Sequence, residues 1–446
     1  MKKITLLFLI LPFLGLSQVQ IGDDIDGEAD NDFSGSSVSL SSDGSIVAIG
    51  APMNSGNSFN SGHVRIYENQ NGAWVQIGQD IDGEVGNDFS GSSVSLSSDG
   101  SIVAIGAPNN SGNAPFSGHV RIYENQNGTW VQIGQDIDGE ALLDESGSSV
   151  SLSSDGNIIA IGAPKNNGNN GVDSGHVRIY ENQNGAWVQI GQDIDGEALG
   201  DQSGSSVSLS SDGNIVAIGA NLNNGNNGVD SGHVRIYENQ NGTWMQIGQD
   251  IDGEATSDES GISISLSSHG SIVAIGAFRN DDNGSDSGHV RIYENQNGTW
   301  MQIGQDIDGE ATSDESGISI SLSSNGSIVV IGAFGNDDNG SNSGHVRIYE
   351  NQNGTWIQIG QDINGEALAD QSGISISLSS NGSIVAIGAV GNDDNGSNSG
   401  HVKIYDLTSV LSTEEPIVNT SKLSSGIYIV EIKTNKGKTS KKLVIE

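Results

Sequence analysis

The chain has no cysteine, and aromatic residues make up only 5% of its 446 residues. Without cysteine it can form no disulfide, thiolate metal site or cysteine nucleophile. Proline is also scarce, with six residues, whereas glycine is abundant, with 64. Beyond the N-terminus no long stretch has helical periodicity, and apolar residues alternate with polar ones between glycine-rich turns. These features predict an all-β protein with many tight turns.

Basic residues are few: 17 Lys and Arg stand against 56 Asp and Glu, for a formal charge of -39. Such a chain repels nucleic acid and anionic membrane surfaces, so we expect neither as a partner. The favoured counterparts are cations, basic proteins and neutral glycans.

One twelve-residue stretch, Ser-Gly-His-Val-Arg-Ile-Tyr-Glu-Asn-Gln-Asn-Gly from Ser61, returns almost unchanged along the chain. Its histidine marks seven copies at intervals of 56 or 57 residues: His63, His119, His176, His233, His289, His345 and His401. A fixed period indicates that one supersecondary unit is repeated seven times.

Each repeat holds four segments in which apolar residues alternate, at 90–98, 101–107, 118–123 and 130–134 in the second copy. In most repeats an Asp-Gly or Asn-Gly pair joins the first segment to the second, and an Asn-Gly pair joins each third segment to the fourth segment that follows it. Such pairs favour type I′ hairpins. Four-stranded antiparallel meanders in series predict a seven-bladed β-propeller. A linear solenoid is the alternative, but it would need atypical polar ends, and the end repeats are ordinary.

The chain ends are offset in a way that suits ring closure. Val19–Gly22 matches a fourth segment but precedes any first one, and the last copy stops after its third segment at Tyr405. We therefore predict a split blade that closes the ring, with three strands from 371–405 and the fourth from 19–25. The propeller would extend over 19–406. The lysine-rich remainder, 407–446, is predicted to form a small separate β segment.

The first 18 residues have the pattern of a secretory signal. Lys2 and Lys3 precede an apolar run at 4–16, which ends in the small-residue stretch 15–17. That run is too short to span a bilayer comfortably, so a cleaved signal is favoured over a transmembrane anchor. We predict a signal peptide at 1–18 and a protein that is secreted or held at the outer cell surface.

Topology separates two faces of the predicted ring. Tight hairpins share one end of each blade, and the remaining loops share the other, which we call the loop face. The loops between second and third strands (2–3 loops), such as 52–60 and 391–396, vary in composition. The loops between repeats (interblade loops) carry Asp-Ile-Asp-Gly-Glu, as at 80–84. Because function often resides in loops on a rigid scaffold, we expect a protein or glycan ligand on this acidic face.

The interblade loops offer carboxylate oxygens at alternate positions, which suits a hard cation such as Ca²⁺. The candidate ligands are Asp80, Asp82, Glu84, Asp88, Asp136, Asp138, Glu140, Asp144, Asp250, Asp252, Glu254 and Asp258. The EF-hand pattern is not met, since Gly78 stands where its first Asp should be. A solvated acidic turn is the alternative.

The repeated histidines invite a catalytic or metal-binding interpretation. However, a catalytic site is singular, and a residue present in all seven repeats favours a scaffold role. The tryptophans could form a glycan platform, but their fixed position at the start of the fourth segment favours packing between blades: Trp74, Trp130, Trp187, Trp244, Trp300 and Trp356. The sequence shows no nucleophile–base pair or phosphate loop, so we predict no enzyme.

The block Ser-Gly-x-Ser-Val-Ser-Leu-Ser-Ser-Asp-Gly-x-Ile-Val-Ala-Ile-Gly-Ala-Pro, with Ser-Gly-His-Val-Arg-Ile-Tyr and Trp after it, resembles the FG-GAP repeat. This is the repeat of integrin α-subunit propellers and many bacterial surface proteins. The resemblance covers 19–406 and implies a propeller used in adhesion. Integrin-type repeats carry an Asp-rich calcium loop between the first two strands. Here that connection is only Ser-Ser-Asp-Gly, which has too few oxygens, so the family's calcium site is not carried over.

The end of the chain, from Leu423 to Glu446, resembles a type IX secretion sorting domain. The resemblance implies export across the outer membrane, with the type IX secretion machinery as a partner. We therefore predict an exported, non-catalytic propeller that binds a ligand or mediates adhesion through its acidic loop face. The alternative is a structural or calcium-binding surface component, and a polysaccharide-active enzyme is less favoured.

Overall fold

The computed structural model describes residues 18–411, 426–434 and 437–445. These residues form strands, turns and loops without a helix, so none of them builds a helix that could cross a membrane. The chain divides into two compact units, Met1–Val410 and Leu411–Glu446. The predicted signal peptide lies outside the described residues, apart from Gln18.

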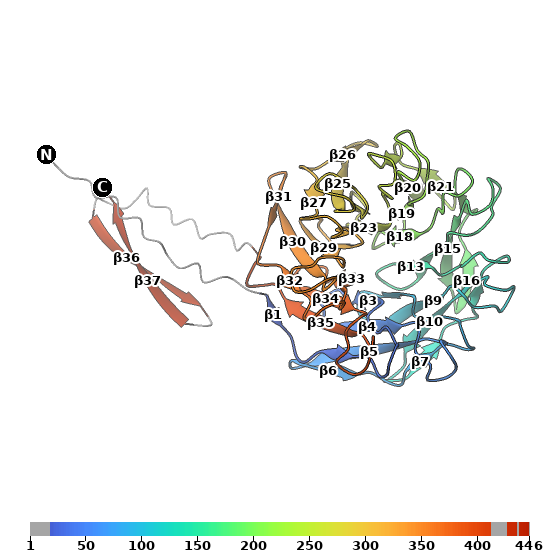
Figure 1. Ribbon diagram of the computed structural model, residues 1–446, viewed down its shortest axis with the longest axis horizontal. Helices are drawn as coiled ribbons and strands as arrows, with labels where there is room; N and C mark the ends of the chain where they lie inside the picture. The colour runs from blue at the N-terminus through green and yellow to red at the C-terminus, as the bar shows by residue number, and fades with distance from the viewer. Residues whose placement is uncertain (1–17, 412–425, 435–436, 446) are drawn as a thin grey trace. The chain divides into compact units, whose positions relative to one another are not determined.

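The larger unit is a ring of seven antiparallel sheets, as the sequence predicts (Figure 1). In the second blade these are β8 (Ser93–Leu96), β9 (Ile102–Ala107), β10 (His119–Asn125), β11 (Trp130–Gln132) and β12 (Ile137–Asp138). Both β11 and β12 pair with β10, so the predicted fourth strand is interrupted and lies along β10 in two pieces. The first strands of all seven blades line the axis of the ring (Figure 1).

The other complete blades repeat this arrangement. The first consists of β3 (Ser37–Leu40), β4 (Ile46–Ala51), β5 (His63–Gln70), β6 (Ala73–Gln76) and β7 (Ile81–Asp82). The third consists of β13 (Ser149–Leu152), β14 (Ile158–Ala163), β15 (His176–Gln183), β16 (Ala186–Gln189) and β17 (Ile194–Asp195). The fourth consists of β18 (Ser206–Leu209), β19 (Ile215–Ala220), β20 (His233–Asn239), β21 (Trp244–Gln246) and β22 (Ile251–Asp252). The fifth consists of β23 (Ser263–Leu266), β24 (Ile272–Ala277), β25 (His289–Asn295), β26 (Trp300–Gln302) and β27 (Ile307–Asp308). The sixth consists of β28 (Ser319–Leu322), β29 (Ile328–Ala333), β30 (His345–Gln352), β31 (Thr355–Gln358) and β32 (Ile363–Asn364).

The seventh blade joins the two ends of the ring, which confirms the predicted split. Its inner strands are β33 (Ser372–Leu378), β34 (Ile384–Ala389) and β35 (His401–Asp406). Its outer pieces are β1 (Val19–Gln20) and β2 (Ile25–Asp26), from the start of the propeller. Val19 pairs with Asp406, and Ile25 pairs with Val402, so every blade carries the same outer edge.

The hydrophobic core lies between neighbouring blades. Between the first and second blades, Val64 and Ile66 of β5 pack with Val103 and Ile105 of β9, all of them buried. Strand alternation directs these residues to the facing sides of adjacent sheets. Because each sheet buries a face against the next, the blades depend on one another for their stability.

The two kinds of tight turn differ in conformation. Between the third and fourth strands, Asn71 and Gly72 both have positive φ values of 60° and 92°, as a type I′ turn requires. Between the first and second strands only the glycine does, for example Gly44 at 73°, so the predicted type I′ turn is wrong there. The reason is that the aspartate side chain closes this turn: Asp43 Oδ1 accepts hydrogen bonds from Ser41 Oγ and Ser45 N.

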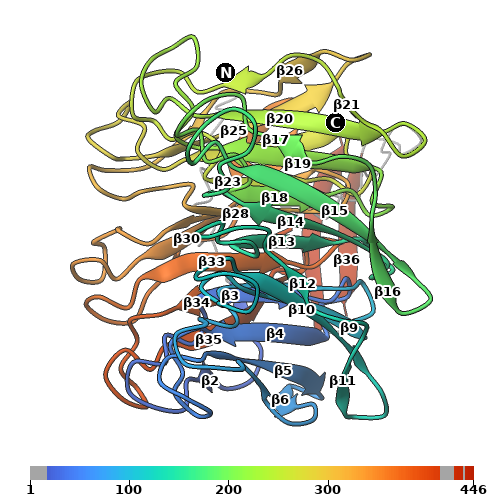
Figure 2. The ribbon, with the colours of Figure 1, turned by 90° about the vertical axis from the view of Figure 1, so that its right-hand side faces the viewer.

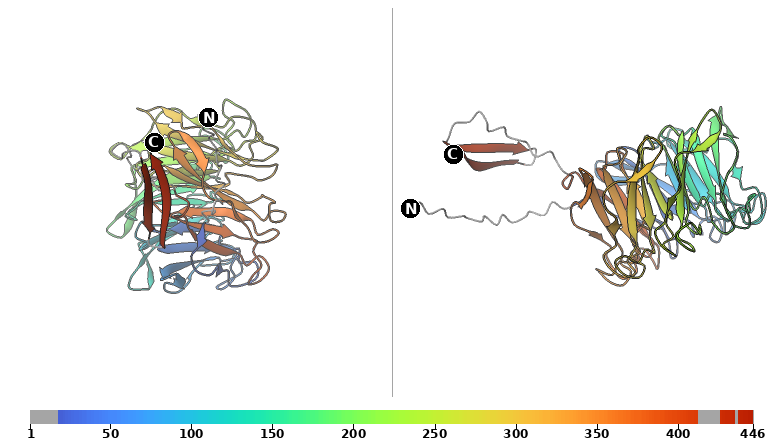
Figure 3. Two further views of the ribbon diagram at one scale, coloured as in Figure 1. Left: turned by 90° about the vertical axis from the view of Figure 1, so that its left-hand side faces the viewer. Right: turned by 90° about the horizontal axis from the view of Figure 1, so that it is seen from above.

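The loop face and the hairpin face are separated as expected (Figure 2). His63 pairs with Ala51 on one side and Asp82 on the other, so the 2–3 loop and the interblade loop start at the same end of the blade. The smaller unit contains one antiparallel ribbon, made of β36 (Gly426–Thr434) and β37 (Gly437–Ile445) (Figure 3).

The turn aspartates predict a pH dependence of stability. Partial burial tends to raise the pKa of Asp99, but hydrogen bonds from Ser101 and Ser97 outweigh this and hold it below its ordinary value. Asp43, Asp155 and Asp212 have lowered pKa values for the same reason, whereas the sixth and seventh blades carry Asn325 and Asn381, which accept the same bonds.

We therefore expect replacement of all four aspartates by Asn to lower the melting temperature at pH 7. A group with a depressed folded pKa stabilises the protein above its unfolded pKa, and this stability is lost as the pH falls through the folded pKa. The difference in melting temperature between wild type and variant should thus shrink as the pH falls below about 4. A difference that stays constant down to acid pH would contradict this account.

Candidate functional site

Each blade places its repeated histidine in a cluster of charged side chains at the loop face. In the second blade the histidine is His119, the first residue of β10, which is 1% exposed. Its Nδ1 lies 3.8 Å from Asp136 Oδ2, in the gap between β11 and β12. Glu84 arrives from the preceding interblade loop, and the three ligand-type atoms lie within 4.8 Å of one another.

An arginine two residues after the histidine completes the cluster. Arg121 is 6% exposed, and its Nη2 donates a 2.7 Å hydrogen bond to the backbone oxygen of Asp82 in the preceding blade. Its Nη1 lies 3.7 Å from Glu84 Oε1. The guanidinium also covers the Tyr123 ring. Arg121 therefore ties the interblade loop of one blade to the third strand of the next.

Burial and the adjacent guanidinium together keep the histidine neutral. Burial, and then the charge of Arg121, lower the pKa of His119 to about 4. Within the described ring, His119 Nε2 has no hydrogen-bond partner. Burial raises the pKa of Glu84, and Arg121 opposes that shift. At neutral pH the imidazole is therefore uncharged, so one of its two nitrogens carries a lone pair.

The last three blades add an aspartate from the 2–3 loop to this cluster. In the fifth blade Asp282 joins His289, Glu254 and Asp306, and in the sixth Asp338 joins His345, Glu310 and Asp362. Asp282 Oδ2 lies 3.9 Å from His289 Nδ1, and Asp338 Oδ2 lies 4.0 Å from His345 Nδ1.

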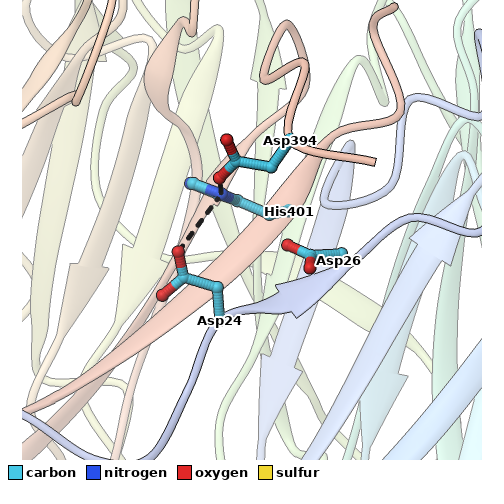
Figure 4. Close-up of side chains that lie close together, drawn as sticks. All are labelled: Asp24, Asp26, Asp394 and His401. Carbon is cyan, nitrogen blue, oxygen red and sulfur yellow. Dashed lines mark ion pairs between the residues drawn. The ribbon is translucent and has the colours of Figure 1, made fainter. Parts of the chain in front are cut away.

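In the seventh blade the cluster also joins the two ends of the ring (Figure 4). His401 Nδ1 lies 3.7 Å from Asp24 Oδ2 and 3.9 Å from Asp394 Oδ2, and Asp26 lies close by. Lys403 replaces the arginine and contacts both Asp24 and Glu366. Residues from the start and the end of the propeller thus build one cluster.

The structure distributes the twelve predicted calcium ligands among different environments. Asp80, Asp136 and Asp250 lie beside the histidine of their own blade. Glu84, Glu140 and Glu254 pair with the arginine of the next blade. Asp88, Asp144 and Asp258 are buried and accept backbone N–H groups of their own loop. The backbone oxygens of Asp82, Asp138 and Asp252 accept hydrogen bonds from arginines.

The four carboxylates of one loop therefore do not converge on one point. The interblade loop crosses from the outer edge of one blade to the inner strand of the next, which takes Asp80 and Glu84 to different histidines. In the clusters of the last three blades, sequence reasoning missed the histidines, the 2–3 loop residues Asp282, Asp338 and Asp394, and the remaining carboxylates Asp24, Asp26, Asp306, Glu310 and Asp362. A signal for the 2–3 loop residues was available, because each of these aspartates stands seven residues before the histidine in the last three copies.

The tryptophans pack between blades, as expected from their fixed position. Trp130 is 4% exposed and donates a hydrogen bond from Nε1 to the oxygen of Ile77 in the preceding blade. All six make this kind of bond, the others being Trp74, Trp187, Trp244, Trp300 and Trp356.

The ring axis is a channel of about 300 Å³ lined by the first strands. The first four blades present Ser-Ser-Val there, as at 36–38, and the last three present Ile-Ser-Ile, as at 262–264. The titratable clusters described above lie outside it, so the channel adds no acid, base or metal ligand.

Comparison with known proteins supports both resemblances. A model of the FG-GAP repeat matches residues 307–349, which contain β27 to β29 and most of β30. A model of the secretion system C-terminal sorting domain matches residues 392–446. That match begins before the predicted boundary at 407, in the last 2–3 loop. It points to a secreted or cell-surface protein and suggests the type IX secretion system.

Among curated proteins, none matches the chain. A solved structure from Bacteroides uniformis, assigned as a 6-phosphogluconolactonase, is 15% identical with a TM-score of 0.52, covering 74% of this chain and 85% of its own. Hydrazine synthase from Kuenenia stuttgartiensis is 12% identical with a TM-score of 0.53, covering 86% of this chain and 96% of its own. At these identities the likeness shows the fold alone.

The cluster predicts that Arg121 stabilises the ring. We expect Arg121→Ala to lower the free energy of unfolding by about 2 kcal/mol, because the Asp82 carbonyl loses its charged hydrogen-bond partner and the Tyr123 ring loses the guanidinium that covers it. Arg121→Lys should cost less, since Lys403 fills the same position in the seventh blade. The measurement is urea unfolding followed by tryptophan fluorescence.

Arg279→Ala is the control for this prediction. Arg279 pairs with Glu259, but its side chain is 50% exposed, so its loss should cost less than about 1 kcal/mol. Equal destabilisation by the two alanine variants would show that the interblade contact of Arg121 stabilises the protein no more than an exposed ion pair does.

Proposed function

We propose that the chain is an exported, non-catalytic binding module that recognises a protein ligand through its loop face. In a secreted or cell-surface protein, such a face would serve adhesion or recognition. The signal peptide at 1–18, the propeller at 19–406 and the sorting segment at 407–446 belong to this proposal. The observation that carries it is the chemistry of the loop tips.

The loop tips of the first four blades expose apolar side chains. Phe59, Val172 and Val229 are 70%, 58% and 59% exposed, each in a 2–3 loop. Exposed Val85 and Leu199 come from the interblade loops beside the first and third of these tips. Each 2–3 loop is hydrogen-bonded to its neighbouring interblade loop, for example Gly200 N to the oxygen of Val172. The apolar groups are therefore held on the surface by backbone bonds.

The same tips are polar in the last three blades. Ser285, Ser341 and Ser397 occupy the position of Val172, and their backbone oxygens accept the equivalent hydrogen bond. One backbone frame thus carries apolar residues at the 2–3 loop tips of the first, third and fourth blades and serines at those of the last three, where exposed Leu368 of the interblade loop lies beside Ser341. Exposed apolar residues that the fold does not require are typical of protein-binding surfaces.

The charge of the loop face favours a ligand with basic as well as apolar side chains. Exposed Glu28, Glu84 and Asp281 lie on this face, and electrostatic complementarity would steer a basic partner towards it. A glycan is less favoured, because Trp130, Trp187 and Trp244 are buried between blades, and the partly buried Trp74, Trp300 and Trp356 are tied to the preceding blade by hydrogen bonds. The calcium sites predicted from the interblade loops remain a prediction.

The absence of unique chemistry favours a binding role over catalysis. Across the described propeller the histidine clusters recur in every blade, whereas a catalytic site requires one singular constellation. Likeness in fold to proteins named as enzymes does not transfer their activity, because one propeller fold can host unrelated functions.

The test is binding of the mature full chain to an array of peptides that combine basic and apolar residues. The loop-face variant is Phe59→Ser, Val172→Ser and Val229→Ser, with the serine taken from the last three blades. We expect it to lose affinity at least tenfold, because the apolar contacts are removed while the backbone frame is kept.

The matched control is Val75→Ser, Val131→Ser and Val188→Ser on the outer strands, which are 42%, 39% and 42% exposed. It makes the same chemical change away from the loop face and should bind like the wild type. No binding by the wild type, or an equal loss in both variants, would refute the proposal.

A further inference from the structure

We propose that the fifth, sixth and seventh blades each bind a divalent transition-metal ion, with Zn²⁺ the best match, through His289, His345 and His401 and the carboxylates around them. These sites do not depend on the protein ligand proposed above. They also differ from the calcium sites predicted within single interblade loops, because their ligands come from several loops.

Each site collects ligands from separate parts of the chain. In the fifth blade His289 opens β25, Asp282 comes from the 2–3 loop, Asp306 lies between β26 and β27, and Glu254 comes from the preceding interblade loop. Glu254 Oε2 and Asp282 Oδ2 each lie 3.9 Å from His289 Nδ1. Zn²⁺ bonds of about 2.0–2.2 Å hold tetrahedral ligands roughly 3.4 Å apart, so a small rotation of exposed carboxylates would complete the site.

The second observation is the histidine itself. His289 and His345 are fully buried, and neither Nδ1 nor Nε2 of either ring has a hydrogen-bond partner among the described residues. In His401, which is 3% exposed, Nδ1 also has no partner within that part of the chain. Buried polar atoms in proteins are normally satisfied, so an unpaired imidazole nitrogen that faces carboxylates indicates a missing ligand.

The unpaired Nδ1 atoms separate the last three blades from the others. In the first four blades only Nε2 is both buried and unpaired, and these blades lack an aspartate seven residues before the histidine. Gly56 and Gly112 stand seven residues before the histidine in the first two blades, and Asn169 and Asn226 in the next two. The buried, unpartnered Nδ1 and the additional carboxylate therefore occur together.

The ligand set selects the class of metal. Ca²⁺ and Mg²⁺ take oxygen ligands, whereas an imidazole nitrogen with carboxylates suits Zn²⁺ and its first-row neighbours. Three carboxylates around each histidine also need positive charge. Arg291, 3.3 Å from Glu254, supplies only part of it in the fifth blade. A divalent ion would supply the rest.

The test uses the mature full chain, produced without a polyhistidine tag and stripped of metal, with Zn²⁺ as the probe. Equilibrium dialysis followed by elemental analysis should find three tight equivalents per chain. The three-ligand clusters of the first four blades should bind at least tenfold more weakly. After Co²⁺ is loaded in place of Zn²⁺, the visible absorption spectrum should be that of a site in which a nitrogen atom is one of the metal ligands.

Two variants change the count in opposite directions. Asp282→Gly reproduces the residue of the first blade and should reduce the tight equivalents to two. Gly56→Asp supplies the fourth ligand to Glu28, His63 and Asp80 and should raise them to four. Gly56 does not have a positive φ, and an added Cβ would approach only the side chain of Asn54 at 3.0 Å, so the change is compatible with the backbone.

Circular dichroism of both variants confirms that a changed count does not reflect unfolding. The proposal is overturned if no tight Zn²⁺ binds, or if seven equivalents bind alike. It is also overturned if the count is the same in both variants and wild type. Ca²⁺ binding with the same stoichiometry, unaffected by His289→Asn, would exclude the nitrogen ligand and the metal class.

Discussion

Packing of each blade against the next around a closed ring is the constraint on which the rest of this structure depends. The interblade loop must cross from the outer edge of one sheet to the inner strand of its neighbour at very close range. A Cβ added to Gly50 would lie 2.1 Å from the backbone oxygen of Gly91 in the next blade, so only glycine fits there. Ser37 Oγ donates a 2.8 Å hydrogen bond to the same oxygen. Because every blade repeats this contact, the repeat tolerates little change at these positions.

The same crossing explains why the charged clusters exist. It carries Glu84 to Arg121 and His119, and it places Asp136 on the other side of the same histidine. A cluster that holds two blades together is also a cluster that can bind a cation. Once the frame is fixed, a single change in a 2–3 loop is enough to alter the chemistry of one blade. This explains why the seven blades have the same backbone arrangement, although the loop surfaces of the first four blades differ from those of the last three.

Much of the fold was predictable because it is repeated. The period, the alternating segments and the offset of Val19–Gly22 together predict seven blades and a split closure, and the structure confirms them. Turn types were less predictable. Asp-Gly favours a type I′ hairpin by residue type, but bonds to the Asp43 carboxylate select a different turn. These bonds depend on flanking serines, which residue-pair preferences ignore.

The site was predicted only in its location. Sequence reasoning placed function on the acidic loop face, yet it grouped carboxylates by their nearness along the chain. In three dimensions Glu254 meets His289 and Asp306, which lie 35 and 52 residues further on. Such long-range groupings follow from how blades pack, and a pattern within one repeat does not contain them. The histidines also seemed structural because they recur, although repetition is compatible with one site in each blade.

The most direct test of this account is anomalous diffraction from crystals of the full chain soaked in Zn²⁺, recorded on both sides of the zinc absorption edge. Three strong peaks are expected on the loop face, within bonding distance of Nδ1 of His289, His345 and His401. The absence of peaks beside these histidines, or equal peaks beside all seven, would contradict it.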